Sequence, residues 1–167
     1  IAVIVDPFDS KRWVEALAIE GLFPTHLIYT HTHRDHTAGY SMMLNLVPDV
    51  EVWGHEEARV PNLLGHMVFK KVDFTHTWNN DPNTTVEWSA GSITLGVTHS
   101  PGHAPGHVTL HGHGVYHAGD LLFTAQSGRV DLPGSNPRAQ LESLQFAREL
   151  LRGLSGEWRL IPGHRYR

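Results

Sequence analysis

Residues 31–36 read His31-Thr32-His33-Arg34-Asp35-His36, so three imidazoles and a carboxylate fall within six positions. They directly follow Thr25–Thr30, whose composition predicts a strand. If the alternation of a strand continues past this segment, His31 and His33 point the same way and can reach one metal ion. Asp35 and His36 follow where the chain turns, so they can face a second ion beside the first. Imidazole and carboxylate suit zinc, iron and manganese.

Three later positions also place a potential metal ligand after a strand-like run and close to glycine. His103 lies in a Pro/Gly-rich loop, Asp120 follows Gly119, and His164 follows Gly163. Glycine permits the tight turns and the close backbone approach that such a site needs. On its own, the segment 31–36 could be a polar turn whose histidines share no role. The three later positions favour a metal site instead.

Strand-like and helical segments alternate along the chain, which predicts a mixed α/β domain. Asp9 or Ser10 is expected to cap a helix that runs to about Glu20, and further helices are expected over Ala38–Leu46 and from Pro137, with Asn136 as the cap. The expected strands are Ile1–Val5, Thr25–Thr30, Val50–Trp53, Thr85–Ser89, Ser92–Thr98, Val108–His111, Val115–His117 and Trp158–Ile161.

Apolar spacing also predicts which side of two helices is buried. In the first helix, we expect Trp13, Ala16 and Leu17 to share the inward face. In the last helix, the predicted buried stripe consists of Leu141, Leu144, Ala147 and Leu151.

The composition narrows the classes of protein and of partner. The chain has 167 residues, of which 40% are hydrophobic and 18% charged, and no apolar run approaches the length of a membrane span. A net charge of −4 without a run of Lys or Arg disfavours a nucleic-acid partner. Cysteine is absent, which excludes disulfides, thiolate ligands and a cysteine nucleophile, while histidine occurs 14 times.

The first residues give two further expectations. Ile1–Val5 is an apolar run with no initiator methionine and no features of a signal peptide. We therefore expect a cytoplasmic protein, and we expect residues 1–167 to form a single domain that lacks segments at both ends.

With these residues in this order, the chain resembles the metallo-β-lactamase-fold hydrolases. Within them it is most similar to the type II glyoxalases (hydroxyacylglutathione hydrolases) and their single-domain relatives. The resemblance extends from Val5-Asp6-Pro7 to His164 and includes the stretch from Gly119 to Gly134, although Phe8 and Arg165 stand where the family usually has glycine. It implies an α/β fold, a four-layer αβ/βα sandwich of two mixed sheets with helices outside, and a dinuclear metal site along one edge.

The resemblance also implies a role for seven residues. Asp35 and Asp120 are the implied catalytic residues. The expected cofactors are two divalent metal ions, zinc first, with iron or manganese as alternatives. The first ion would be held by His31, His33 and His103, the second by Asp35, His36 and His164, and Asp120 would bridge the two.

Residues around the ligands have two possible roles. Arg129 could contact the carboxylate of an anionic substrate or form a structural pair near Asp131. His107 and His117 flank ligand segments and could orient a ligand or serve only in packing. His55, with the two glutamates that follow it, is expected to begin a helix rather than to form a second metal cluster.

Two cations bridged by Asp120 and a water would lower the pKa of that water to about 7 and supply hydroxide. The predicted function is therefore metal-dependent hydrolysis, in which a bridging hydroxide cleaves a small-molecule thioester. The resemblance implies a thioester of the hydroxyacyl-glutathione type. Two alternatives remain open: a persulfide dioxygenase with one iron on His31, His103 and Asp120, and a metal-binding module without turnover. The sequence does not predict an oligomeric state.

Overall fold

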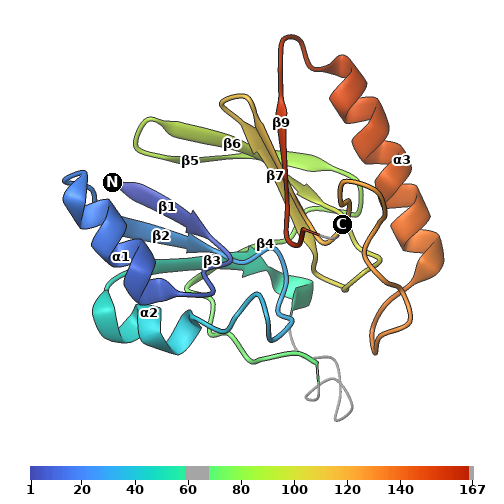
Figure 1. The fold of residues 1–167 in the computed structure, drawn as a ribbon. Helices are drawn as coiled ribbons and strands as arrows, with labels where there is room; N and C mark the ends of the chain where they lie inside the picture. Colours follow the sequence, from blue (N-terminus) through green and yellow to red (C-terminus); the bar gives the residue numbers. More distant parts are fainter. Residues whose placement is uncertain (59–67, 166–167) are drawn as a thin grey trace.

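The structure, a computed structural model, describes residues 1–58 and 68–165, which form two face-to-face β-sheets with α-helices outside them (Figure 1). One sheet has the strand order β1-β2-β3-β4, and the other has the order β5-β6-β7-β8-β9. The strands are Ala2–Val5 (β1), Pro24–Ile28 (β2), Glu51–His55 (β3), His76–Trp78 (β4), Thr85–Ala90 (β5), Ile93–His99 (β6), Val108–Gly112 (β7), Val115–Gly119 (β8) and Arg159–Pro162 (β9).

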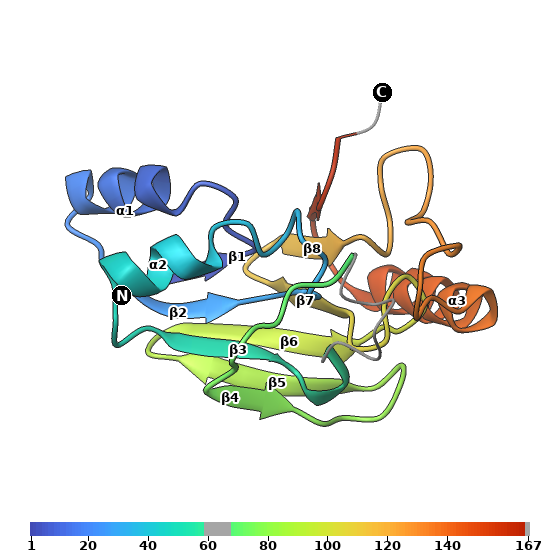
Figure 2. The same cartoon turned by 90° about the horizontal axis from the view of Figure 1, so that it is seen from below.

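Successive residues of β2 face opposite sides of its sheet, and this alternation separates two hydrophobic cores. Leu27 packs in the core beneath the outer helices of this sheet, whereas Ile28 packs with Trp88 between the two sheets. A third core, with Tyr116 and Ala147, lies between the second sheet and α3. In Figure 1, α1 and α2 lie below β1 to β3 and α3 lies beside β7 and β9; Figure 2 shows the same helices at opposite ends of the molecule. The expected four-layer αβ/βα sandwich is therefore confirmed.

The strand directions differ in one detail from the expectation of two mixed sheets. Within the described residues, all neighbouring strands of the first sheet are parallel. The second sheet is mixed, because β5 to β8 pair antiparallel and β9 joins β8 in parallel. The strand β4 was not expected. It has only three residues, too few for an alternating pattern to be recognised.

The helices are α1 (Ser10–Ile19), α2 (Tyr40–Leu46), α3 (Pro137–Gly153) and the short 3-10 helix η1 (Glu56–Ala58). The predicted caps are confirmed: Asp9 accepts from the backbone N–H of Arg12, and Asn136 accepts from those of Arg138 and Ala139. A helical turn does follow His55, and residues 59–67 lie outside the described part. No helix among the described residues has both the length and the apolar character of a membrane span.

The inward faces of α1 and α3 confirm two predictions in part and correct the rest. In α1, Trp13 is 49% exposed and Ala16 is also exposed, and the residues turned inward are Ser10, Val14 and Leu17. In α3, Leu144, Ala147 and Leu151 pack in the third core as predicted, but Leu141 is 56% exposed. Gln140 and Ser143 are buried instead. Ser10 donates to the carbonyl of Gly39, and Ser143 donates to that of Pro101. These two hydrogen bonds fix the rotation of each helix. The spacing of apolar residues gives no indication of them.

Candidate metal centre

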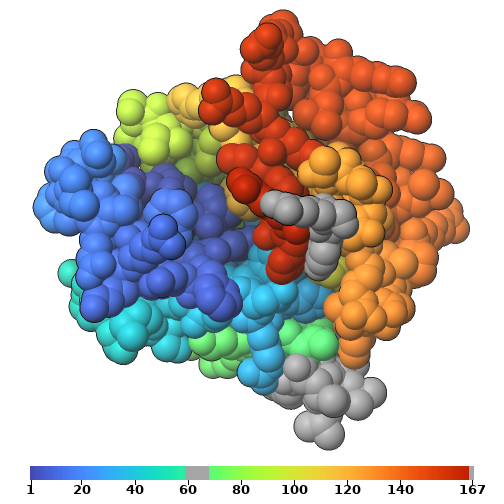
Figure 3. Space-filling model, viewed as in Figure 1, coloured from blue at the N-terminus to red at the C-terminus, as the bar shows by residue number. Residues whose placement is uncertain are grey.

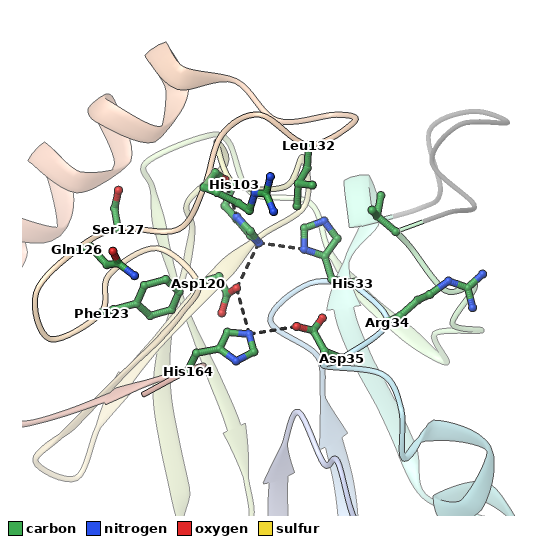
Figure 4. Close-up of a pocket in the computed structure, with 12 residues that line it drawn as sticks. His33, Arg34, Asp35, His103, Asp120, Phe123, Gln126, Ser127, Leu132 and His164 are labelled. Carbon is green, nitrogen blue, oxygen red and sulfur yellow. Dashed lines mark hydrogen bonds and ion pairs between the residues drawn. The ribbon is translucent and has the colours of Figure 1, made fainter. Parts of the chain in front are cut away.

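The segments that carry the seven predicted ligands meet at one edge of the two sheets. Figure 4 labels five of these ligands, which are His33, Asp35, His103, Asp120 and His164. Residues 31–36 follow β2, and His103 lies in the loop after β6. Asp120 follows β8, and His164 follows β9. The space-filling view shows the C-terminal strand, in red, between the N-terminal part and the orange loop that follows β8 (Figure 3). All seven side chains are brought together here, although the first and the last of them, His31 and His164, lie 133 residues apart in the sequence.

His31, His33 and His103 form a first group of donor atoms. His33 Nδ1 lies 3.0 Å from His31 Nε2 and 2.9 Å from His103 Nε2, and all three side chains are buried. Burial lowers the pKa of His31 well below its usual value and lowers that of His33 to about 4. Burial also lowers the pKa of His103, so the three rings are neutral at pH 7.

Hydrogen bonds at the outer nitrogens determine where the lone pairs of this group point. His103 Nδ1 donates to the carbonyl of Arg129 at 2.8 Å. His31 Nδ1 donates to the hydroxyl of Thr30, which itself donates to Asp6. The Nε2 lone pairs of His31 and His103 therefore both point at His33 Nδ1, which cannot donate fully to both. Converging imidazole lone pairs without matching protons fit a metal cation.

Asp35, His36 and His164 form a second group. His164 Nε2 lies 3.1 Å from Asp35 Oδ2 and 3.3 Å from His36 Nε2. Burial by itself would lower the pKa of His36, but the carboxylates of Asp6 and Asp120 outweigh it and raise that pKa to about 10. A cation at this position would take the place of the His36 proton, so the donor set also fits a metal.

Asp120 lies between the two groups. Its Oδ1 is 3.1 Å from His36 Nε2, and its Oδ2 is 3.3 Å from His103 Nε2 and 3.5 Å from His164 Nε2. Burial would raise the pKa of Asp120, but the hydrogen bond from His36 and the neighbouring histidines lower it to about 2. The carboxylate is thus ionised and faces both groups, as a bridging ligand requires.

Asp6, at the end of β1, belongs to this centre although the sequence analysis assigned it no role. Its carboxylate accepts from Thr30 N–H at 2.8 Å and lies 2.8 Å from His36 Nδ1. It forms a third cluster of potential ligands with His31 and His36. Because the Asp6 contact occupies Nδ1, His36 presents Nε2 to the centre. The sequence did contain a signal for this role, because Asp6, like several of the predicted ligands, follows a strand.

Two further side chains hold the ligand segments in place. His107 Nε2 accepts from the backbone N–H of Asp120 at 3.0 Å, and its Nδ1 faces the hydroxyl of Ser100 at 3.0 Å. Burial lowers the pKa of His107 to about 3, so the ring is neutral and can accept. Gln140 Oε1 accepts from His103 N–H at 2.8 Å, and its Nε2 donates to the carbonyl of Leu121 at 3.1 Å. Of the two roles considered for His107, the contacts support the orienting one.

Comparison with known proteins agrees with this geometry. The family model described as the Metallo-beta-lactamase superfamily matches residues 2–164. The chain belongs to this superfamily. It is 31% identical, over 165 residues, to a hydroxyacylglutathione hydrolase of Xanthomonas campestris pv. campestris, an alignment that covers 99% of this chain and 56% of the relative. Another hydroxyacylglutathione hydrolase, from Aeromonas salmonicida, is 30% identical over 128 residues, which cover 77% of this chain and 45% of the relative. The chain thus spans about half the length of these curated relatives.

Solved structures of the superfamily share the fold. The BLEG-1 B3 metallo-beta-lactamase superposes with a TM-score of 0.79 at 27% identity, covering 98% of this chain and 80% of that one. The structure titled TTHA1623 in a di-iron-bound form gives a TM-score of 0.72 at 28% identity, with 97% and 81% covered. The superfamily fold therefore accounts for the arrangement of both sheets.

In this superfamily member, a cavity of about 560 Å³ lies in front of the candidate metal centre (Figure 4). Arg129 is on its wall and forms a two-pronged ion pair with Asp131, with Nε–Oδ1 and Nη2–Oδ2 distances of 2.7 and 2.8 Å. The ion pair that was considered as a structural role for Arg129 is therefore present. A contact between Arg129 and the substrate stays a prediction. The cavity is lined by His33, Arg34, Asp35, Val68, His103, Asp120, Phe123, Gln126, Ser127, Arg129, Leu132 and His164.

Proposed function

We propose that this chain is the catalytic part of a metal-dependent thioester hydrolase that acts on hydroxyacyl derivatives of glutathione. One observation carries the hydrolase proposal: the Asp120 carboxylate faces both donor groups, at 3.1 Å on one oxygen and 3.3 Å on the other. The names of the curated relatives support the choice of substrate.

The residues present fit two metal ions. His31, His33 and His103 would hold one, Asp35, His36 and His164 would hold the other, and Asp120 would contact both. We propose zinc first, with iron or manganese as alternatives, because the donors are imidazole nitrogens and carboxylate oxygens. When bound, two such cations supply an acidified water and a polarised carbonyl.

The chain's own side chains position the reactants. Asp6 fixes the ring of His36, and His107 fixes the backbone of Asp120, through the hydrogen bonds described above. Asp35 has a side chain that is 55% exposed, and its Oδ2 faces His164. Its Oδ1 can therefore accept a proton from a water that attacks the thioester carbonyl. Phe123 is 4% exposed and lines the cavity beside His164, at a ring distance of 6.0 Å, so it shields one side of the reacting group.

The proposal is tested by a hydrolysis assay on protein stripped of metal and then reloaded with zinc, iron or manganese separately. Hydrolysis of a hydroxyacyl thioester of glutathione is expected only after reloading, and Asp120→Asn should abolish it. Asp49→Asn is the matched control, because Asp49 is exposed and precedes β3, at the end of the sheet away from both donor groups. Full loading with metal but no turnover of thioesters, while lactones or phosphodiesters are cleaved, would refute the substrate assignment. No turnover of any of these would favour a metal-binding module.

A further inference from the structure

His55 and His99 form a buried pair of imidazole rings outside both donor groups of the candidate metal centre. Their ring centroids lie 3.7 Å apart at an interplanar angle of 19°, so the two rings stack. His55 is the last residue of β3 and His99 is the last residue of β6, so the pair joins the two sheets. The side chains are 1% and 0% exposed. Their ring nitrogens therefore depend on groups of the protein for hydrogen bonds.

Both rings meet at the backbone carbonyl of Asn80, whose oxygen lies 3.1 Å from His55 Nε2 and 3.1 Å from His99 Nδ1. His55 Nδ1 accepts from the backbone N–H of Glu57 at 3.2 Å. His55 therefore carries its proton on Nε2 and donates it to Asn80. Burial, and after it the charge of His99, lowers the pKa of His55, so this ring is neutral at pH 7.

His99 differs from its partner, because acceptors face both of its ring nitrogens. Its Nε2 lies 2.9 Å from the carbonyl oxygen of Pro105. The ring can donate to both carbonyls only when it carries a proton on each nitrogen. The carboxylate of Glu57, 3.9 Å from His99 Nε2, is the nearest to the ring among the described residues and favours this charged form. Glu56, next to it in η1, acts electrostatically on His55.

The carbonyl of Pro105 connects this pair to the candidate metal centre. Pro105 belongs to the loop of residues 100–107 between β6 and β7, which also carries the predicted ligand His103. The loop packs closely on η1, because a Cβ on Gly106 would lie 2.0 Å from the backbone nitrogen of Ala58. The loop is thus held at two adjacent residues, by the ring of His99 and by η1.

We propose that His99 is a positioning residue for the first donor group and that it acts through its second ring proton. With a proton on each nitrogen, the ring ties the loop of residues 100–107 to Asn80. When the pH rises and the ring loses one proton, a nitrogen lone pair faces a carbonyl oxygen in either neutral form, which weakens the hold on the loop. This role goes beyond the proposed function, since it concerns the order of a ligand loop and holds for any substrate.

The test follows the ring and the loop together in zinc-loaded protein, which is diamagnetic. Nitrogen NMR reports the protons on His99 as the pH rises from 5 to 9. Amide exchange of Gly102 and His107, whose N–H groups donate within the loop, reports its order. After correction for the intrinsic pH dependence of exchange, their protection should fall by at least about 5-fold as the ring loses a proton, the factor for one buried hydrogen bond. The amides of β2 should keep their protection.

Two variants and a control sharpen the test. Glu57→Gln keeps the size of a side chain that is 55% exposed and removes its charge, so the ring and the loop should both change at a lower pH, by the same amount. His99→Gln cannot donate to both carbonyls, so the loop should be weakly protected at every pH. Competition with a chelator should show about 10-fold weaker metal binding in this variant. His76→Gln should change neither property, because His76 also stacks on an aromatic ring, that of Trp53, but begins β4, away from the ligands.

Two results would overturn the inference: loop protection that stays constant while the His99 ring titrates, and a ring that carries a single proton throughout the series. If His99→Gln does not fold, Glu57→Gln still decides, because a shift of the ring titration that the loop does not follow would also overturn it. No thioester enters these measurements. Absence of thioester hydrolysis would therefore refute the proposed function and leave the role of His99 intact.

Discussion

Gln140 offers a direct way to test how the two ligand segments are held. The substitution Gln140→Met keeps the length of the side chain and removes both of its hydrogen bonds. His103 N–H then loses its acceptor at 2.8 Å, and the carbonyl of Leu121, next to Asp120, loses its donor at 3.1 Å. Gln140 is 3% exposed, so water does not readily replace either partner.

The expected effect follows from these two unpaired groups. A buried polar group without a partner costs about 1–3 kcal/mol, so Gln140→Met should lower the free energy of unfolding by about 2–6 kcal/mol. Partners that orient metal ligands typically contribute 10–100-fold to metal affinity. We therefore expect the variant that still folds to bind metal at least 10-fold more weakly than the wild type.

Urea unfolding of metal-free protein measures the change in the free energy of unfolding, and competition with a chelator measures the change in metal affinity. Glu142→Ala is the control on the same helix, because it removes only an exposed ion pair with Arg138 and should cost less than about 0.5 kcal/mol. The reasoning is refuted if Gln140→Met matches this control in stability and keeps the metal affinity of the wild type.

Three other predictions follow from the centre. Asp120→Ala should lose bound metal and activity together, whereas His113→Ala, at an exposed turn, should change neither; wild-type metal content in the Asp120 variant, measured by elemental analysis, would contradict the bridging role. Gly119→Ala should melt at a lower temperature, because φ is +49° and the added Cβ would lie 2.6 Å from a ring nitrogen of His107; calorimetry showing an unchanged Tm would oppose this. The metal-free protein should be most stable near pH 6.5. The pKa of His36 is raised to about 10, so its contribution to stability is fully present below pH 6.5 and declines as the pH rises toward 10. The pKa of His33 is lowered to about 4, so stability is lost as the pH falls below 6.5. Urea unfolding in chelator at pH 5, 6.5 and 8.5 checks this, and a stability that rises above pH 6.5 would contradict it.

The sequence predicted the fold because local signals and the layered architecture agree. Strand patterns and helix caps such as Asn136 depend on neighbouring residues, and they locate most elements. The inward faces of α1 and α3 could be predicted only in part in this way, since Leu17 and Ala147 turn inward as expected but Trp13 and Leu141 do not. Ser10 and Ser143 turn inward because each donates to a carbonyl 29 or 42 residues away, and no local pattern contains that partner.

The same distinction applies to the metal centre. Residues 31–36 stand out because potential ligands are adjacent in the chain, and the later positions stand out because each follows a strand. Asp6 and Gln140 were missed: Asp6 follows a strand, which was a usable signal, but its contact is with His36, 30 residues away, and Gln140 acts on His103, 37 residues away, from within a helix. A carboxylate or an amide shows its function only once the fold brings that partner to it.

Metal quantification is the measurement that tests the central claim most directly. Protein purified without added metal, or saturated with zinc and then freed of excess, should contain about two metal ions per chain, one for each donor group around Asp120. A single iron per chain, together with thiol-dependent consumption of oxygen, would contradict the dinuclear hydrolase and favour the mono-iron alternative.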